Sequence, residues 1–337
     1  MSAVDASECV RADLVVDVSG SCDIAGRLRV AATVFLPRPD ALAAGATVVY
    51  ALPGGGYSRG YFDMHFPGRA GYSQAEHHVS AGLVMVAIDH LGVGQSSPQV
   101  CDQLRVEDIA AANHAAVTAI SRLLEQGGAA AKYPPVHIAR RIGVGQSMGG
   151  AVTVIMAGVH GSYDAIAVLG FSGIHTVLPL LDQHQTAEVA GSIELGADRR
   201  DGDPADQSVA RTAALIPDFL YPFFWSDVPD DIVDADTRGG YPLREQAPVF
   251  GSATLPNCAG AMLSPGYIAA EAAMVRCPVF IGLGERDAAT NPHSEPSAYG
   301  RSTDVTLFIC DRMAHMHNFA STRGKLWDRL VGWCQSL

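Results

Sequence analysis

The sequence predicts an α/β protein in which a mostly parallel sheet is covered by helices. Short apolar runs rich in β-branched residues alternate with longer segments whose apolar residues recur at helical spacing. Hydrophobic residues make up 48% of the 337 residues, which is enough to fill a large core. The expected strands are Leu14–Val18, Val30–Phe35, Thr47–Leu52, Leu83–Ile88, Ile142–Val144, Ala165–Gly170, Val279–Leu283 and Val305–Cys310.

Three of the segments between or after these strands have the pattern of helices. Val106–Glu125 carries apolar side chains on one helical face, Gly149–Val159 is rich in small residues, and Lys325–Cys334 closes the chain. The apolar face of the first consists of Ile109, Ala112, Ala116, Ile120 and Leu123, and that of the last of Leu326, Leu330 and Trp333.

The alternation of strands and helices stops between about Ser172 and Arg276. Residues 191–240 contain eleven acidic and four basic residues around the aromatic run Phe219–Trp225. An acidic, solvated exterior with an apolar centre is typical of a lid over a pocket, and a peripheral helical excursion with its own small core is the alternative. We predict a core of residues 1–171 and 277–337 and a helical cap insertion over 172–276.

Charge and hydropathy exclude several classes of function. The 23 Lys and Arg against 35 Asp and Glu leave a formal net charge of −12, which disfavours nucleic acid and anionic membrane surfaces as partners. No apolar run reaches the ~18 residues that a membrane-spanning helix needs. The first ten residues contain neither a basic residue nor a continuous apolar run, unlike a secretory signal, so the expected location is cytoplasmic. Nothing in the sequence indicates an oligomeric state.

The cysteines and histidines do not indicate a metal or cofactor site. The seven cysteines are scattered, form no C-x-x-C pair and are expected to be reduced core residues. His77-His78 and the His-x-His at 315–317 have no carboxylate or cysteine at ligand spacing. Gly92-Val93-Gly94 lacks the third glycine of a dinucleotide-binding loop. We therefore expect neither a metal nor a cofactor.

Two segments match the pattern G-x-S-x-G, Gly145–Gly149 and Gly56–Gly60. Ser147, in the first, directly follows an apolar strand and precedes small residues that open a helix. A nucleophile on a tight strand-to-helix turn needs small neighbours, and the helix N-terminus directs partial positive charge at its oxygen. Ser58, in the second, lies in a glycine-rich loop without such a helix. Ser147 is the candidate nucleophile, and Ser58 is at most a pocket residue.

A serine hydroxyl needs a base to take its proton and a carboxylate to orient that base. Asp287 follows one expected strand and His315 follows the next, so both would lie on loops at the same edge of a parallel sheet as Ser147. Glu285 is the alternative acid, and His317 is the alternative base.

Several landmarks together resemble the α/β-hydrolase superfamily. They are the nucleophile elbow GQSMGG at 145–150, the order Ser–Asp–His, the turn Asp89–Ser96 after the fourth strand, and the glycine-rich loop Pro53–Tyr57. They run from about Thr47 to Phe319. The resemblance implies the α/β-hydrolase fold with an eight-stranded, mostly parallel sheet, a Ser–His–Asp triad, and hydrolysis through a covalent acyl-enzyme.

The resemblance also implies roles for individual residues. His315, with Phe319 as the apolar anchor that follows it, fits the family's base better than His317. The oxyanion hole would consist of the backbone N–H of Met148 and a second N–H from the glycine loop. Gly55 is the first choice for that second donor and Gly56 the alternative, with Pro53 standing where the family often has a histidine. The residues expected to line the substrate pocket are Tyr57, Phe224, Trp225 and His317.

These observations predict a serine hydrolase that cleaves a carboxylic ester, thioester or lactone of a small, largely apolar substrate through an acyl-enzyme. Serine at position 147 argues against dehalogenases and epoxide hydrolases, which form an alkyl ester on aspartate. Carbon–carbon bond hydrolysis or acyl transfer by the same triad is the alternative. A ligand receptor on this fold without turnover is a third possibility, although such proteins commonly lose a triad residue.

Overall fold

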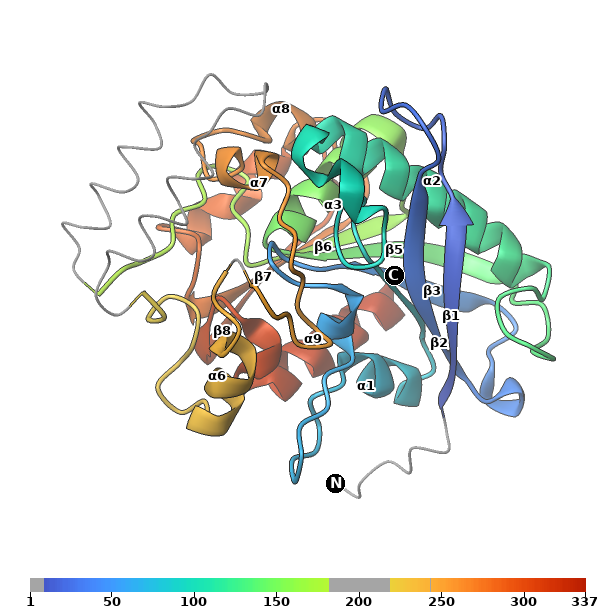
Figure 1. Ribbon diagram of the computed structural model, residues 1–337, viewed down its shortest axis with the longest axis horizontal. Helices are drawn as coiled ribbons and strands as arrows, with labels where there is room; N and C mark the ends of the chain where they lie inside the picture. Colours follow the sequence, from blue (N-terminus) through green and yellow to red (C-terminus); the bar gives the residue numbers. More distant parts are fainter. Residues whose placement is uncertain (1–8, 182–218, 243) are drawn as a thin grey trace.

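The computed structural model describes residues 9–181, 219–242 and 244–337, arranged around a central sheet (Figure 1). The sheet has eight strands in the order β1-β2-β4-β3-β5-β6-β7-β8. Every neighbouring pair from β4 to β8 is parallel, and only β1–β2 and β2–β4 are antiparallel. The strands are β1 (Cys9–Asp17), β2 (Arg29–Pro37), β3 (Ala46–Leu52), β4 (Val84–Ile88), β5 (Ile138–Gln146), β6 (Ala165–Leu169), β7 (Val279–Arg286) and β8 (Val305–Ala314). The predicted eight-stranded, mostly parallel sheet is confirmed.

Helices cover both faces of the sheet (Figure 1). On one face α2 (Val106–Glu125) packs against α3 (Met148–His160), and on the other lie α1 (Gln74–Ser80) and α9 (Arg323–Ser336). Alternate residues of a strand point to opposite faces, so β3 supplies Val48, Tyr50 and Leu52 to the first layer and Val49 and Ala51 to the second. The short helices are η2 (Pro39–Ala41), η3 (Arg59–Phe62), η4 (Pro98–Gln103), α6 (Asp230–Thr237), α7 (Cys258–Ala261), α8 (Ala269–Ala272), η5 (Pro292–Tyr299) and η6 (His317–Phe319).

The strand ends determine where the site lies. Helix α2 has the predicted bounds, but β5, β7 and β8 are longer than their apolar runs. β5 begins at Ile138 because Arg140 and Arg141, although polar, still pair with β3 at the exposed end of the strand. At their other ends β5, β7 and β8 stop one residue before Ser147, Asp287 and His315, respectively. Since these strands are parallel, all three residues emerge at one edge of the sheet.

The chain between β6 and β7 contains the predicted cap. Its described part holds α6, α7, α8 and the aromatic run 219–225, of which Phe223 and Phe224 are buried. Residues of its last third join the hydrophobic cluster around α3, namely Cys258, Met262, Ile268, Ala272 and Val275. Residues 182–218, with more than half of the acidic side chains of the 191–240 stretch, lie outside the described residues. The cap boundaries and its role as a lid stay predictions.

All seven cysteines lie among the described residues and none of them forms a disulfide there; Cys101, Cys258, Cys310 and Cys334 are buried. Cys9, Cys22 and Cys277 are partly exposed, so the prediction of buried reduced thiols holds for four of the seven. Among the helices of the described residues, none is both long and apolar enough to cross a bilayer.

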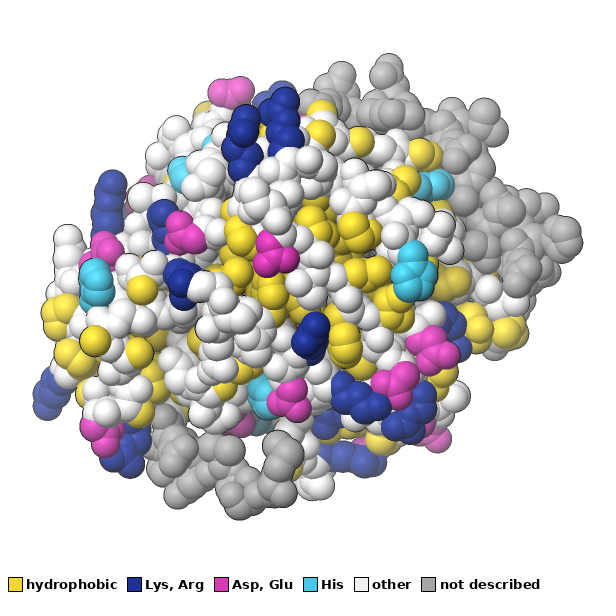
Figure 2. Space-filling view, turned by 180° about the vertical axis from the view of Figure 1, so that it is seen from behind, with side chains coloured by type: hydrophobic (Ala, Val, Ile, Leu, Met, Phe, Trp, Pro, Cys, Tyr) yellow, Lys and Arg dark blue, Asp and Glu magenta, His cyan; other side chains and the backbone are white. Residues whose placement is uncertain are grey.

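The face turned away from the view of Figure 1 is mixed in character (Figure 2). Hydrophobic side chains gather near its middle, and basic and acidic side chains lie interspersed around them. The net negative charge of the chain is therefore not concentrated on this face.

Candidate active site

Ser147 occupies a sharp turn between the end of β5 and the start of α3. Its backbone has φ 52° and ψ −120°, in the left-handed region that a residue with a side chain seldom adopts, which costs about 1–3 kcal/mol. The turn is held by the Ser147 N–H, which donates to the Leu169 carbonyl at 2.8 Å. A strained serine at the N-terminus of a helix is the geometry that exposes a nucleophilic hydroxyl.

The glycines on either side of Ser147 allow this turn to form. A Cβ placed on Gly145 would lie 2.0 Å from the carbonyl oxygen of Gly149. A Cβ on Gly149 would lie 2.1 Å from the carbonyl oxygen of Leu52 in β3. Both contacts are with backbone atoms, so a larger residue at either position would force the turn or the helix that follows it to shift.

The three residues predicted to form the triad lie in hydrogen-bond contact. Nε2 of His315 is 2.9 Å from Oγ of Ser147, and Nδ1 of His315 is 2.7 Å from Oδ1 of Asp287. Because an ionised carboxylate only accepts hydrogen bonds, Nδ1 carries the ring proton of the neutral imidazole. Nε2 then presents its lone pair to the serine hydroxyl, which is the arrangement for taking the serine proton.

The carboxylate of Asp287 is held by four donors. Oδ1 accepts from His315 and from the Ala288 N–H at 2.7 Å, and Oδ2 accepts from the Gly284 N–H at 2.8 Å and from Nε2 of His317 at 2.6 Å. Burial alone would raise the pKa of this carboxyl, but His317 and His315 outweigh burial and hold its pKa well below the usual range. These contacts therefore favour the ionised form of Asp287.

The alternative residues are engaged elsewhere. Glu285 is exposed and accepts the Arg312 backbone N–H at 2.9 Å. His317 is buried against Asp287 and lies on the far side of that carboxylate from His315. Ser58 is the N-cap of η3, where Oγ accepts from the Gly60 N–H and donates to the Val249 carbonyl. Of the two serines in G-x-S-x-G matches, only Ser147 contacts a histidine among the described residues.

The glycine loop lies against the Ser147 turn. A Cβ on Gly54 would be 3.2 Å from Cβ of Ser147, and the Tyr57 N–H closes the turn 54–57 by donating to the Gly54 carbonyl at 3.2 Å. Within the described part of the chain, the N–H groups of Gly55 and Gly56 have no hydrogen-bond acceptor. The Met148 N–H, the first of α3, has no acceptor inside its helix. These N–H groups are therefore available as donors, and their assignment to an oxyanion hole stays a prediction.

Comparisons with known proteins agree on the architecture. No family model matches the sequence, and no curated protein matches it. Among solved structures, bromoperoxidase from Bacillus anthracis has a TM-score of 0.60 at 14% identity, with 96% of this chain and 100% of that chain covered. A thermophilic esterase from Thermogutta terrifontis has a TM-score of 0.59 at 12% identity, covering 96% and 98%. The peroxisomal α/β-hydrolase from Saccharomyces cerevisiae has 0.58 at 14% identity, covering 98% and 89%.

The chain has the α/β-hydrolase fold. In it, the Ser147 turn is the link from β5 to α3, Asp287 follows β7 and His315 follows β8. The resemblance inferred from the sequence is thereby confirmed as to the fold.

The predicted pocket residues of this hydrolase-fold protein are all near the triad loops, but their described contacts are with protein groups. Tyr57 is buried, and its hydroxyl donates to Asp236 at 2.5 Å. Phe224 packs edge-on against Phe319, with ring centroids 5.5 Å apart. The Arg286 guanidinium lies over the Trp225 ring at 4.7 Å. That these residues and His317 line a substrate pocket stays a prediction.

Sequence analysis missed two residues that contact His315. The ring of Phe223 meets the imidazole edge-on at 5.9 Å. Nε2 of Gln146, the residue before the nucleophile, donates to the His315 carbonyl at 2.9 Å. Gln146 is part of the elbow motif and Phe223 is part of the aromatic run, so both were adjacent to residues already singled out.

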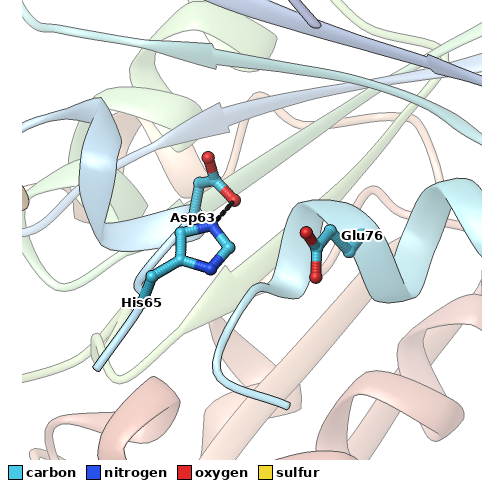
Figure 3. A group of neighbouring side chains, drawn as sticks. All are labelled: Asp63, His65 and Glu76. Atoms are coloured by element: carbon cyan, nitrogen blue, oxygen red, sulfur yellow. Dashed lines mark hydrogen bonds and ion pairs between the residues drawn. The ribbon is translucent and has the colours of Figure 1, made fainter. Parts of the chain in front are cut away.

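One group of side chains outside the triad has the composition of a metal site (Figure 3). Asp63, His65 and Glu76 each bring a potential ligand atom within 4.8 Å of the others. The Asp63 carboxylate, however, is already bound by Arg11 at 3.1 Å and by the Ser73 hydroxyl at 2.7 Å. The positive charge of the Arg11 guanidinium on Asp63 disfavours the binding of a cation by this group. The group comes from the loop after η3 and from α1, separate from the loops that carry the triad.

Proposed function

We propose that the protein is a serine hydrolase that cleaves a carboxylic ester of a small, largely apolar substrate through an acyl-enzyme. The observation that carries the proposal is the continuous hydrogen-bonded chain from Ser147 through His315 to Asp287. The fold, shared with an esterase of known structure, is consistent with it.

Each step of the reaction has a group to perform it. Ser147 Oγ attacks the ester carbonyl while its proton passes to Nε2 of His315. The negative charge on the carbonyl oxygen is stabilised by the N–H of Met148 and of Gly55, and each such donor lowers the barrier by about 2.7–4 kcal/mol. His315 then protonates the leaving alcohol, and the acyl-enzyme remains on Ser147.

Water completes the cycle by the same route in reverse. His315 takes a proton from the water, which attacks the acyl carbonyl, and Ser147 recovers its proton as the acid leaves. Throughout, Asp287 keeps the proton-bearing Nδ1 of His315 oriented and stabilises the imidazolium that forms in each step. The aromatic ring of Phe223 against His315 supports an apolar acyl or alcohol portion in the substrate.

The test is covalent labelling combined with turnover. A fluorophosphonate should add one phosphonyl group, which mass spectrometry would locate on Ser147, and p-nitrophenyl esters of increasing acyl length should be hydrolysed. Ser147→Ala should lose both reactions. Ser58→Ala, which removes the serine of the second motif, should still be labelled. A Ser147→Ala variant that hydrolyses these esters at the wild-type rate would refute the proposal.

A further inference from the structure

A buried ion pair connects the chain between β6 and β7 to the glycine loop. Nη2 of Arg244 is 2.6 Å from Oδ1 of Asp236, and both side chains have 0% exposure. Nε of Arg244 also donates to the Asp236 carbonyl at 3.3 Å. Asp236 belongs to α6, and Arg244 follows it by eight residues, so the pair is local in sequence.

The pair is completed by residues of the glycine loop. The Tyr57 hydroxyl donates to the second oxygen of Asp236 at 2.5 Å, and the Arg244 guanidinium lies over the Tyr57 ring at 4.6 Å. Nη1 of Arg244 donates to the Gly56 carbonyl. Both oxygens of the carboxylate and all three nitrogens of the guanidinium are thus engaged, as a buried ion pair requires if it is not to destabilise the fold.

The Gly56 carbonyl is therefore held from two sides. Besides Arg244, the Ser252 N–H donates to it at 2.9 Å. Gly56 occupies the turn 54–57 with φ +79°, a conformation that glycine adopts without penalty. External contacts of this kind keep the N–H groups of a glycine turn aimed at one point.

We propose that Asp236 and Arg244 are positioning residues that fix the turn 54–57 so that the Gly55 N–H is preorganised for the oxyanion. The inference rests on the serine hydrolase activity proposed above. Neither side chain touches the reacting atoms. Arg244 acts through the Gly56 carbonyl, and Asp236 acts by orienting Arg244 and Tyr57.

Two variants test this in the full-length protein. Arg244→Lys keeps a charge opposite Asp236, but a single ammonium cannot reproduce the fork that reaches Asp236 and Gly56 together. The double variant Arg244→Met/Asp236→Leu replaces the ion pair by apolar side chains, which avoids leaving one buried charge unpaired. Arg69→Met is the matched control. It removes the exposed ion pair between Arg69 and Asp231, a residue of the same helix α6, and this pair does not contact the glycine loop.

We expect the test variants to lose stabilisation of the transition state while they bind the substrate about as well as the wild type does. Both test variants should lower kcat about 10- to 100-fold, somewhat less than complete removal of an oxyanion donor, with KM changed less than about 3-fold. A trifluoromethyl ketone mimics the transition state, because Ser147 Oγ adds to its carbonyl and forms an oxyanion. Its inhibition constant should rise by the same factor as kcat falls. The pH midpoint of kcat/KM should not move, because His315 and Asp287 are untouched. Arg69→Met should match the wild type.

Amide hydrogen exchange gives a readout that does not depend on turnover. The N–H groups of Tyr57 and Ser252, both bonded within or to the turn, should exchange faster in the two test variants than in the wild type or Arg69→Met. Arg244→Lys decides the question if the double variant does not fold, as judged by near-ultraviolet circular dichroism.

Wild-type kcat and ketone affinity in a folded test variant would overturn the positioning role. A parallel rise in KM with no change in kcat would overturn it as well, and would assign these residues to substrate binding. In either case the wild type still hydrolyses esters and is labelled at Ser147. If the wild type does neither, the hydrolase proposal itself fails, whereas the exchange experiment still reports on the turn.

Discussion

Asp287 lies between two histidines, with Oδ1 2.7 Å from Nδ1 of His315 and Oδ2 2.6 Å from Nε2 of His317. The N–H groups of Gly284 and Ala288 complete its contacts. A buried carboxylate with four donors is fixed in orientation, and the His315 ring that it holds is fixed with it.

Replacing the acid should disable the base. In Asp287→Asn the amide can accept from only one histidine and leaves the imidazolium without a countercharge, so kcat for a p-nitrophenyl ester should fall by about 10⁴. Steady-state kinetics would measure it. Glu285→Gln, which keeps the acceptor for the Arg312 N–H, should remain at the wild-type rate. An equal loss of kcat in both variants would show that Asp287 has no specific role in catalysis.

Removing the second histidine should shift the pH profile. Without the Nε2–H of His317, the Asp287 carboxylate is less stabilised and its pKa rises. A more basic carboxylate stabilises protonated His315 better, so the acid limb of kcat/KM should move to higher pH in His317→Phe. In His317→Gln, whose amide nitrogen can stand in for Nε2, most of the shift should disappear. An acid limb that stays in place in both variants would contradict this account.

A single methyl group in the elbow should be damaging. Gly149→Ala places Cβ against the Leu52 carbonyl, so α3 must move away from β3, which should destabilise the fold by about 1–3 kcal/mol. Because the Met148 N–H moves with the helix, kcat should fall by about 10²-fold. Urea unfolding and kinetics give both numbers. The control is Gly332→Ala in α9, which meets nothing within 4 Å and should stabilise the fold by up to about 1 kcal/mol.

Acid should destabilise the fold through buried neutral histidines. Burial lowers the pKa of His78 to about 3 and that of His90 to about 4, from an ordinary value of 6.5. The unfolded chain therefore binds protons first, so this stability is complete above pH 6.5 and is lost as the pH falls from 6.5 toward those values. At pH 5 each histidine should cost about 2 kcal/mol relative to pH 7.

His78→Phe isolates one of the two contributions. The Nε2 atom of His78 is buried without a partner among the described residues, so phenylalanine removes a polar group that has to stay neutral. The free energy of unfolding should fall by about 2 kcal/mol less between pH 7 and pH 5 in the variant than in the wild type. Identical losses in the two proteins would contradict the assignment.

The sheet and the triad order could be predicted from the sequence because both follow from local patterns. Apolar runs identify the eight strands, and Ser147, Asp287 and His315 each lie within five residues of the end of such a run. Parallel pairing then brings the three residues to one edge without further information. The second partner of Asp287 was harder to assign, because the spacing of His315 and His317 does not say which oxygen each ring meets.

The support of the glycine loop could not be predicted. Asp236 is one of eleven acidic residues in an apparently solvated stretch, and nothing in its neighbours distinguishes a carboxylate with 0% exposure from the rest. Its contacts with Tyr57 and, through Arg244, with Gly56 span about half the chain. Phe223, rather than Phe224 or Trp225, contacts His315. The sequence could not show which aromatic residue does so, because the run lies outside any helix or strand and has no periodicity to indicate its orientation.

The Arg244–Gly56 contact also bears on protein engineering. An exchange of the stretch between β6 and β7 with that of another protein of this fold would treat the stretch as a module independent of the chemistry. Here that stretch contains the guanidinium that clamps the loop beside the nucleophile. A chimera would therefore have to carry over Asp236 and Arg244 together with the new segment, or redesign the glycine turn to be rigid by itself.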